Sequence, residues 1–334
     1  MPFALTHQEC LVVRLSALGD AILTTGVLKY WHEQAGLTFR VLTKPHFAPI
    51  FDNHPAVSGI IGVEEKDLHG QGWVRFCRHL AHDHGHLRLV DLHANLRTMV
   101  LRLVWPGQAR KYPKSSLIRR IFLTSGGRFF GARLRRANVP QRYSMALQGT
   151  PAPVDQVRPI VYLRPDETAS ARNLLHRLGL TRPIAIHPYA THPAKTPPPQ
   201  VWQTAINLLR NAGHEVVVIG RSPASLVAGS SFDLTNSTDL RLTAALLSHC
   251  SGLLTGDSGP MHLGTAVSTP TIALFGPTTK EWGFYPSGPG DRVHQVVCPQ
   301  SPCSLHGQQA CRLNNRCMTE IPPRLLVDLA GQLA

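Results

Sequence analysis

Short apolar runs alternate with helix-like stretches along most of this chain, and the alternation restarts once. Strands are expected at residues 10–15, 38–42, 59–63 and 87–92 and, after a Pro-rich connector at 149–154, at 184–187, 215–220, 252–255 and 271–275. Helices are expected at residues 21–31, 166–178, 201–211, 240–250 and 260–267. Because strands that alternate with helices form parallel sheets covered on both faces, the sequence predicts an α/β fold of two doubly wound domains, residues 1–155 and 156–334. Ligands bind such sheets beyond the carboxyl ends of the strands, so one cleft between the domains is expected.

The length and the apolar content agree with this division. A chain of 334 residues with 43% hydrophobic residues can bury two cores. No run approaches the roughly 18 apolar residues that a membrane-spanning helix needs. Residues 1–10 lack the basic and then apolar layout of a secretion signal. We therefore expect a soluble, cytoplasmic protein.

The net charge of +14 belongs to the first half of the chain. Residues 1–150 hold 20 of the 34 Lys and Arg residues but only 9 of the 20 Asp and Glu residues. Residues 92–154 contain twelve cations and no carboxylate. Such a field suits a polyanionic partner, namely nucleic acid, an anionic membrane surface or a phosphorylated substrate; the alternative is a solvated basic face. Aromatic residues make up only 7% and no nucleic-acid motif accompanies the charge, so no nucleic-acid partner is expected.

Residues 253–262, Leu-Leu-Thr-Gly-Asp-Ser-Gly-Pro-Met-His, predict an apolar strand that breaks into a turn and opens a helix. Free backbone N–H groups and the helix dipole favour an anion there, and Gly259 permits its close approach. His262, one turn into the helix, would face back toward the anion. A carboxylate beside an anion is unfavourable, so Asp257 is expected to bind something else, such as sugar hydroxyls or an ammonium group.

Gly19 and Asp20 follow the first expected strand and open the first helix. A carboxylate at this place is commonly an N-cap, which stabilises the helix by about 1 kcal/mol. It can also act as a general base that faces the cleft. The residues alone leave both roles open.

Lys195 lies in the Pro-rich loop that follows the strand expected at 184–187. A lysine held there can contact a phosphate as a point charge, and Thr191 can donate a hydrogen bond to the same group. The alternative is a solvated loop lysine. A similar loop recurs at residues 275–279, where the alternative is an ordinary turn.

Several cofactor and metal signatures are missing from the sequence. It contains no Gly-x-Gly-x-x-Gly after the first strand of either half, no P-loop and no Asp-x-Asp, so we expect neither a cofactor nor a metal ion in the site. Four cysteines crowd the end of the chain without a Cys-x-x-Cys pair, which favours reduced thiols or a local disulfide over a structural metal: Cys298, Cys303, Cys311 and Cys317. The histidines at 79, 82, 84 and 86 are expected in a polar loop rather than a metal site.

Five motifs together carry a family resemblance. They are residues 14–20 (Arg-Leu-Ser-Ala-Leu-Gly-Asp), 91–97 (Asp-Leu-His-Ala-Asn-Leu-Arg), 112–114 (Tyr-Pro-Lys), 256–262 and 275–278. In this order, and spread over most of the chain, they resemble the ADP-heptose glycosyltransferases of the lipopolysaccharide inner core, the bacterial heptosyltransferase family known as glycosyltransferase family 9. The resemblance implies two Rossmann-like domains in the GT-B arrangement, with an acceptor-binding N-terminal half and a nucleotide-sugar-binding C-terminal half. It also implies inversion at the anomeric carbon without a metal.

The resemblance assigns roles residue by residue. Asp20 matches the catalytic base and Lys195 the lysine on the donor phosphate, with Thr191 beside it. The pyrophosphate is expected on the N–H groups of Ser258 and Gly259, the sugar hydroxyls on Asp257, and the donor in front of His262. The basic region, represented by Arg97, Lys111 and Lys114, is expected to bind a phosphorylated lipid A-core acceptor during peripheral contact with the inner membrane.

One position departs from the family pattern. Some members carry a ribose-binding glutamate after the strand that ends at Ile219-Gly220, where this chain reads Arg221-Ser222. An arginine there could favour a different sugar nucleotide, or the ribose contact could come from elsewhere in the chain. Three alternatives stand beside ADP-heptose transfer: another nucleotide sugar as the donor, a protein as the acceptor, or a noncatalytic protein that binds sugar nucleotides.

Overall fold

The computed structural model describes residues 8–296, 303, 311 and 314–333, and the chain divides into two compact units. Unit 1 comprises Met1–Lys114 and Val139–Tyr162, and unit 2 comprises Ser115–Asn138 and Leu163–Ala334. The boundaries between the units lie after residues 114, 138 and 162, whereas the sequence predicted one boundary between residues 155 and 156. Residues 115–138 group with unit 2 because their apolar side chains Phe122 and Leu134 pack against Trp282.

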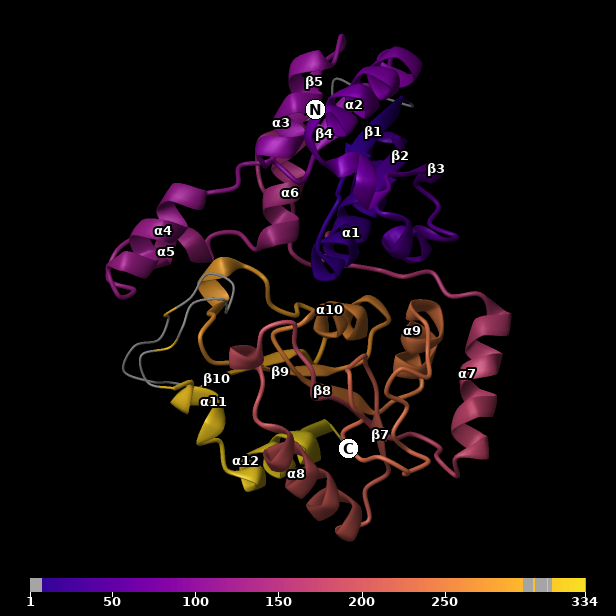
Figure 1. Ribbon diagram of the computed structural model, residues 1–334, viewed down its shortest axis with the longest axis vertical. Helices are drawn as coiled ribbons and strands as arrows, with labels where there is room; N and C mark the ends of the chain where they lie inside the picture. Colours follow the sequence, from indigo (N-terminus) through magenta and orange to yellow (C-terminus); the bar gives the residue numbers. More distant parts are fainter. Residues whose placement is uncertain (1–7, 297–302, 304–310, 312–313, 334) are drawn as a thin grey trace. The chain divides into compact units, whose positions relative to one another are not determined.

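Unit 1 is built on a five-stranded sheet in the order β3-β2-β1-β4-β5, in which all pairs are parallel. Its strands are β1 (Glu9–Val13), β2 (Thr38–Thr43), β3 (Val57–Gly62), β4 (Arg88–Asp91) and β5 (Ala109–Lys111). Its helices are α1 (Leu18–Ala35), α2 (Gly70–His84), α3 (Leu96–Val104) and α6 (Val139–Gln148), with short 3-10 helices at Pro45–Phe51 and Glu65–Leu68. Helix α1 packs beside α6, and α2 beside α3 (Figure 1).

The segment after α6 is tied to the middle of α1 by a close backbone approach. A Cβ atom at Gly26 would lie 2.0 Å from the carbonyl oxygen of Arg158, so only glycine fits there. Beside it, the Ile160 N–H donates to Thr25 Oγ1 at 2.9 Å. Residues 139–162 therefore return to the unit that residues 1–114 begin.

Unit 2 repeats the architecture with the parallel order β10-β9-β8-β6-β7. Its strands are β6 (Ile184–His187), β7 (Val216–Val218), β8 (Gly252–Gly256), β9 (Thr271–Phe275) and β10 (Arg292–Gln295). Its helices are α4 (Ser116–Thr124), α5 (Gly131–Arg135), α7 (Pro165–Arg177), α8 (Pro199–Asn211), α9 (Leu240–Ser248), α10 (Gly259–Ala266), α11 (Arg316–Thr319) and α12 (Pro323–Ala330), with 3-10 helices at Pro193–Lys195, Lys280–Trp282 and Gly331–Leu333. In Figure 1, α8 and α12 lie below the sheet and α9 and α10 above it.

The expected α/β class is confirmed, because both sheets are parallel and their central strands are buried. Strands β6, β8 and β9 are buried along their full lengths, as the continuous apolar runs predict. The edge strands β5 and β10 were not expected from the sequence, because each is short and contains more polar than apolar residues.

The expectation of a polar loop is wrong for three of the four histidines, which lie on a helix, whereas His86 lies in the turn that follows it. His79, His82 and His84 lie on α2, whose other face buries Trp73, Cys77, Leu80 and Ala81 at helical spacing. Among the described helices, none is long and apolar enough to cross a membrane.

Candidate active site

Asp20 lies in the first turn of α1, just beyond the end of β1. The N-cap of this helix is Ala17, so Asp20 is not itself the cap, one of the two roles left open by the sequence. Asp20 stands three residues further on, and its Oδ2 accepts the Ala17 N–H at 3.2 Å. The Asp20 carboxylate thus accepts the backbone N–H of the N-cap residue, and it can still bind other groups.

Arg14 and Tyr143 hold the Asp20 carboxylate from two sides. Arg14 Nη2 lies 2.5 Å from Asp20 Oδ2, and the Tyr143 hydroxyl donates to Asp20 Oδ1 at 2.7 Å. The Arg14 guanidinium lies over the Tyr143 ring, 5.4 Å from its centroid, and donates to the carbonyl of Leu92. The Arg14 and Asp20 side chains are only 6% and 16% exposed, so this is a buried ion pair with additional hydrogen bonds.

The surroundings keep Asp20 ionised. Burial alone would raise the pKa of Asp20, but the Arg14 charge and the hydrogen bonds from Tyr143 and Ala17 outweigh burial and lower that pKa. Burial raises the pKa of Tyr143 well above its usual value, so its hydroxyl keeps the proton that it donates. At neutral pH Asp20 is therefore a carboxylate and can accept a proton.

The two oxygens of Asp20 are not equally occupied. Among the residues that the structure describes, Oδ2 receives both Arg14 and Ala17, whereas Oδ1 receives Tyr143 alone. Each carboxylate oxygen offers about two lone-pair positions, which leaves one on Oδ1. Oδ1 can therefore accept one further hydrogen bond.

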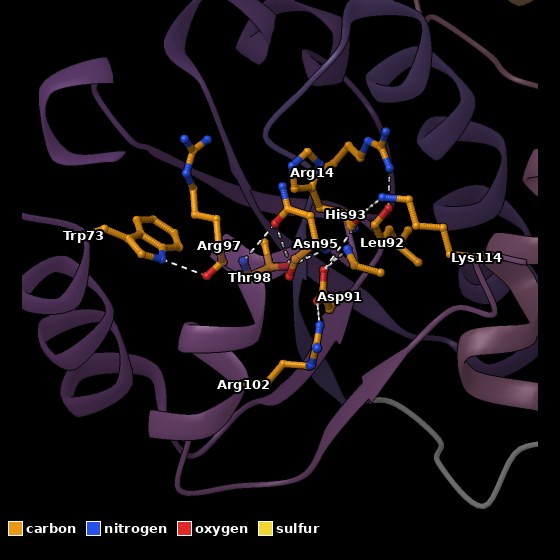
Figure 2. Close-up of polar contacts among 11 residues, drawn as sticks. Arg14, Trp73, Asp91, Leu92, His93, Asn95, Arg97, Thr98, Arg102 and Lys114 are labelled. Atoms are coloured by element: carbon orange, nitrogen blue, oxygen red, sulfur yellow. Dashed lines mark hydrogen bonds and ion pairs between the residues drawn. The ribbon is translucent and has the colours of Figure 1, made fainter. Parts of the chain in front are cut away.

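The loop after β4 is fixed by a second buried carboxylate, as Figure 2 shows. Asp91 Oδ1 accepts the N–H groups of His93 at 3.0 Å and Ala94 at 2.7 Å, and Oδ2 pairs with Arg102. Asn95 then caps α3 by accepting the Thr98 N–H at 2.9 Å. The motif at residues 91–97 thus builds a rigid turn at the carboxyl end of β4.

This turn places His93 among cations. His93 is 8% exposed, and burial followed by the charge of Arg14 lowers its pKa to about 3. The charges of Lys114 and Arg97 act in the same direction. His93 is therefore neutral at pH 7 and can exchange hydrogen bonds without adding charge.

The three residues expected to bind the acceptor lie on different parts of unit 1. Lys114 Nζ donates to the carbonyl of His93 at 3.5 Å, and Arg97 lies in the first turn of α3, which follows the same loop (Figure 2). Lys111 is exposed at the end of β5, where it lines a surface hollow of about 530 Å³ with Arg110 and Met145. The structure gathers Arg97 and Lys114 at the β4 turn, while Lys111 belongs to the hollow.

In unit 2 the turn after β8 leads directly into α10. Ser258 is the N-cap and Gly259 and Pro260 form the first two helical positions. The Ser258 hydroxyl does not cap the helix but contacts His187 Nδ1 at 3.2 Å and Thr255 Oγ1 at 3.1 Å. The first N–H groups of α10 have no intrahelical acceptor, so this helix start can receive an anion.

Asp257 and Lys195 are brought together across 62 residues. Lys195 Nζ lies 2.8 Å from Asp257 Oδ2, and Thr278 Oγ1 donates to the same oxygen at 2.8 Å. The Lys195 and Asp257 side chains are 16% and 13% exposed, so Lys195 is not the solvated loop lysine of the alternative interpretation. Lys195 thus supplies an ammonium group, one of the two kinds of partner expected for Asp257.

The remaining expected donor residues differ in their exposure. His262 is buried on α10, with 3% of its surface exposed, and Thr191 is exposed in the loop before Lys195. Arg221 is also exposed, in the loop after β7. Burial lowers the pKa of His187, behind Ser258, to about 4, so this histidine is neutral at pH 7.

The late cysteines form no recognisable metal centre in the described part of the chain. Cys298 lies outside the described residues, Cys317 is buried, and Cys303 and Cys311 are half-buried. Among the residues that the structure describes, no group of three or more His, Cys, Asp or Glu side chains is placed to hold a metal ion.

Three partners of the site residues were not assigned a role from the sequence. Arg14 lies at the end of an apolar run, and a buried arginine needs a partner of opposite charge, so its position could have predicted an ion pair. Thr278 lies in one of the five family motifs, but the resemblance assigned it no role. Tyr143 carried no signal, because only the packing of α6 on α1 brings its hydroxyl to Asp20.

Comparison with known structures establishes the fold class. The chain superposes on a glycosyl transferase family 9 protein from Veillonella parvula with a TM-score of 0.75 and 17% identity, covering 100% of this chain and 99% of that one. It superposes on the ADP-heptose LPS heptosyltransferase II of E. coli with a TM-score of 0.71 and 19% identity, covering 98% of each chain. The two Rossmann-like doubly wound domains are those of the GT-B fold class, as predicted.

Sequence comparison establishes the family. The model of glycosyltransferase family 9 (heptosyltransferase) matches residues 136–315, and the chain belongs to this family. A lipooligosaccharide heptosyltransferase 2 of Campylobacter jejuni is 31% identical over 103 residues. That match spans 30% of this chain and 31% of the relative.

Proposed function

We propose that the protein transfers heptose from ADP-heptose to a hydroxyl of a phosphorylated lipopolysaccharide inner-core acceptor, with inversion and without a metal ion. The observation that carries this proposal is the ionised Asp20 carboxylate, which has one open position on Oδ1. A family 9 chain with a positioned base of this kind is equipped for a single displacement.

The proposed reaction is one displacement at the anomeric carbon of the donor, with Asp20 as the base. The acceptor oxygen attacks the anomeric carbon of the donor from the face opposite ADP, and its proton passes to Asp20 Oδ1. The bond from the anomeric carbon to the diphosphate oxygen breaks, and ADP leaves with the electron pair. One displacement inverts the configuration at this carbon.

Unit 2 supplies charge for the departing ADP. Lys195 and the first N–H groups of α10 favour a growing negative charge, the kind of preorganised electrostatic stabilisation that usually contributes most to catalysis. When a diphosphate binds Lys195, Asp257 keeps the hydrogen bond from Thr278 and can accept sugar hydroxyls. The proposed donor site comprises Thr191, Lys195, Asp257, Ser258, Gly259 and His262, and the contacts of Lys195 and Asp257 support it.

Unit 1 supplies the acceptor side. Arg97 and Lys114 flank the rigid turn that presents His93, and a phosphorylated sugar suits this concentration of cations. The acceptor is lipid-linked, so the protein is proposed to act in the cytoplasm in peripheral contact with the inner membrane.

A ligand panel tests the donor. ADP-heptose, UDP-sugars, GDP-sugars and NAD are added in turn to the purified protein, and the unfolding temperature is recorded. A ligand present at 100 times its Kd stabilises the folded state by about 2.7 kcal/mol, so ADP-heptose alone should raise the temperature by several degrees. Stabilisation only by another nucleotide sugar, with Arg221 in its binding loop, would overturn the donor assignment.

Activity is then tested with the stabilising donor and an inner-core acceptor carrying phosphate. ADP release that depends on the acceptor supports transfer. Tight donor binding without ADP release from any lipid-linked or protein acceptor would instead identify a noncatalytic sugar-nucleotide-binding protein.

A further inference from the structure

The chain leaves unit 1 after Lys114, forms a helical hairpin on unit 2 and returns at Val139. This hairpin, residues 115–138, consists of α4, a turn and α5 (Figure 1). Its inner side is anchored by apolar packing: Phe122 meets Trp282 edge-on with ring centroids 5.5 Å apart, and Leu134 joins them. The hairpin is therefore a fixed part of unit 2.

Polar contacts reinforce the same anchor. Arg119 Nη2 donates to the carbonyl of Trp282 at 2.8 Å, and its guanidinium lies 5.3 Å from the centroid of the Phe284 ring. At the second helix, Arg135 Nη1 lies 2.8 Å from Glu281 Oε1. Two of the arginines of the basic region thus have structural roles.

The outer side of the hairpin exposes large apolar side chains. Leu117 is 70% exposed, Phe129 61% and Phe130 43%. Phe130 also has a φ of 67°, a backbone conformation that is uncommon for a bulky residue, and it gains little burial there. Two consecutive exposed phenylalanines at the tip of a fixed hairpin are costly to leave in water.

Every charged residue of the hairpin is an arginine. Arg120, Arg128, Arg133 and Arg136 are exposed, and the hairpin lies inside the stretch of residues 92–154 that lacks Asp and Glu. Aromatic rings favour the interface between lipid headgroups and acyl chains, and each arginine near an anionic leaflet contributes about 1 kcal/mol of attraction. Exposed Leu and Phe combined with exposed positive charge match a membrane surface better than a polar nucleic acid.

We infer that the hairpin of residues 115–138 is a membrane-docking element that inserts Phe129 and Phe130 into the headgroup region of an anionic phospholipid bilayer while its arginines bind lipid phosphates. The choice of a membrane as the occupant rests on the proposed lipid-linked acceptor. The binding itself requires neither donor nor acceptor, so its failure is distinguishable from a failure of the proposed transfer.

Vesicle sedimentation tests the inference with the full chain. The protein should bind vesicles of phosphatidylglycerol and phosphatidylethanolamine at 0.1 M salt, and vesicles of phosphatidylcholine at least about 10-fold more weakly. The F129S/F130S variant should bind the anionic vesicles at least about 10-fold more weakly than the unchanged chain. The control L208S removes a 36% exposed leucine from α8 of the same unit and should leave binding unchanged.

Insertion is measured separately with F129W and L208W. The emission of the tryptophan at 129 should shift to the blue on anionic vesicles and be quenched by brominated lipid, whereas the tryptophan at 208 should do neither. Unfolding temperatures of all variants verify that the hairpin remains folded. Equal vesicle binding by the F129S/F130S variant, or displacement of vesicles by a short RNA that binds more tightly, would overturn the inference.

Discussion

The Tyr143 hydroxyl donates a hydrogen bond to Asp20 Oδ1 at 2.7 Å, although 123 residues separate the two in sequence. This bond is one of the interactions that lower the pKa of Asp20 against the effect of burial. The same hydrogen bond fixes the orientation of Oδ1, the oxygen that is proposed to accept the proton of the acceptor hydroxyl.

Tyr143→Phe should move the acidic limb of the kcat/KM profile to higher pH. The substitution removes a hydrogen bond that favours the ionised carboxylate, so the pKa of Asp20 rises and the base is lost earlier as the pH falls. Profiles between pH 4 and 8 measure the shift. Tyr112→Phe, which alters the neighbouring ring 4.8 Å away, is the packing control and should leave the limb in place. An unmoved limb in Tyr143→Phe would contradict the role of Asp20.

Asp20→Asn should lower turnover by about 10²- to 10⁴-fold and leave donor affinity unchanged, because the amide cannot accept the proton. It should also destabilise the fold by about 3–5 kcal/mol, since Arg14 is left as a buried charge without its partner. Activity, donor binding and denaturant unfolding measure the three effects. The double variant Arg14→Met/Asp20→Asn removes the unpaired charge and should regain stability but not turnover.

Lys195→Met and Asp257→Asn should have different effects on two ligands. Loss of the lysine removes charge from the proposed diphosphate contact, so ADP and ADP-heptose should both bind about 10-fold or more weakly. Loss of the Asp257 carboxylate should weaken ADP-heptose more than ADP, because its proposed contacts are with the sugar. Calorimetric titration with both ligands separates these patterns, and equal losses for both ligands in Asp257→Asn would refute the sugar contact.

Gly256→Ala should displace the Lys195 loop. The added Cβ would lie 2.5 Å from the Lys195 carbonyl oxygen, which belongs to the backbone and cannot move alone. A loss of about 1–3 kcal/mol of stability and weaker ADP binding should follow. Gly331→Ala is the matched control in unit 2, because its Cβ would meet nothing within 4 Å. Unchanged ADP affinity in Gly256→Ala would show that the loop does not position the donor.

Stability should begin to fall with acid near pH 6.5, before the carboxylates titrate. Burial lowers the pKa of His54 and His187 to about 4 and that of His93 to about 3, so the unfolded chain binds more protons below pH 6.5. The contribution of each is complete above pH 6.5 and decreases by at most about 1.4 kcal/mol per pH unit until the folded pKa is reached. Unfolding curves at pH 8, 7, 6 and 5 measure this slope.

His54 offers a direct check of the acid effect. Its Nδ1 accepts the Ala56 N–H at 3.2 Å while Nε2 faces the Thr25 carbonyl at 3.0 Å, a pattern that only the neutral ring satisfies. His54→Gln should therefore reduce the slope between pH 7 and 5, even where the variant is less stable overall. A slope unchanged from the unaltered protein would exclude His54 as a contributor.

The sequence predicted most of the regular structure around the site for a local reason. The run Ile184–His187 and the run Thr271–Phe275 are strands with the expected bounds, because central parallel strands are buried on both faces and must be apolar throughout. The α2 helix was missed because its histidines obscured the apolar spacing of Trp73, Cys77 and Leu80. The motifs that follow β1 and β8 were recognised because the start of a helix requires particular residue types at closely spaced positions.

By itself the sequence determined that Asp20, Lys195 and Asp257 lie where parallel strands end, because strand, turn and helix are set by neighbouring residues. Only the tertiary structure decided their partners. Arg14 and Tyr143 lower the pKa of Asp20 because α6 packs on α1, and Lys195 neutralises Asp257 because the β6 loop approaches Gly256 too closely for any side chain. The ionisation and hydrogen bonding of a carboxylate depend on distances of a few ångströms between residues remote in the chain, and only packing sets those distances.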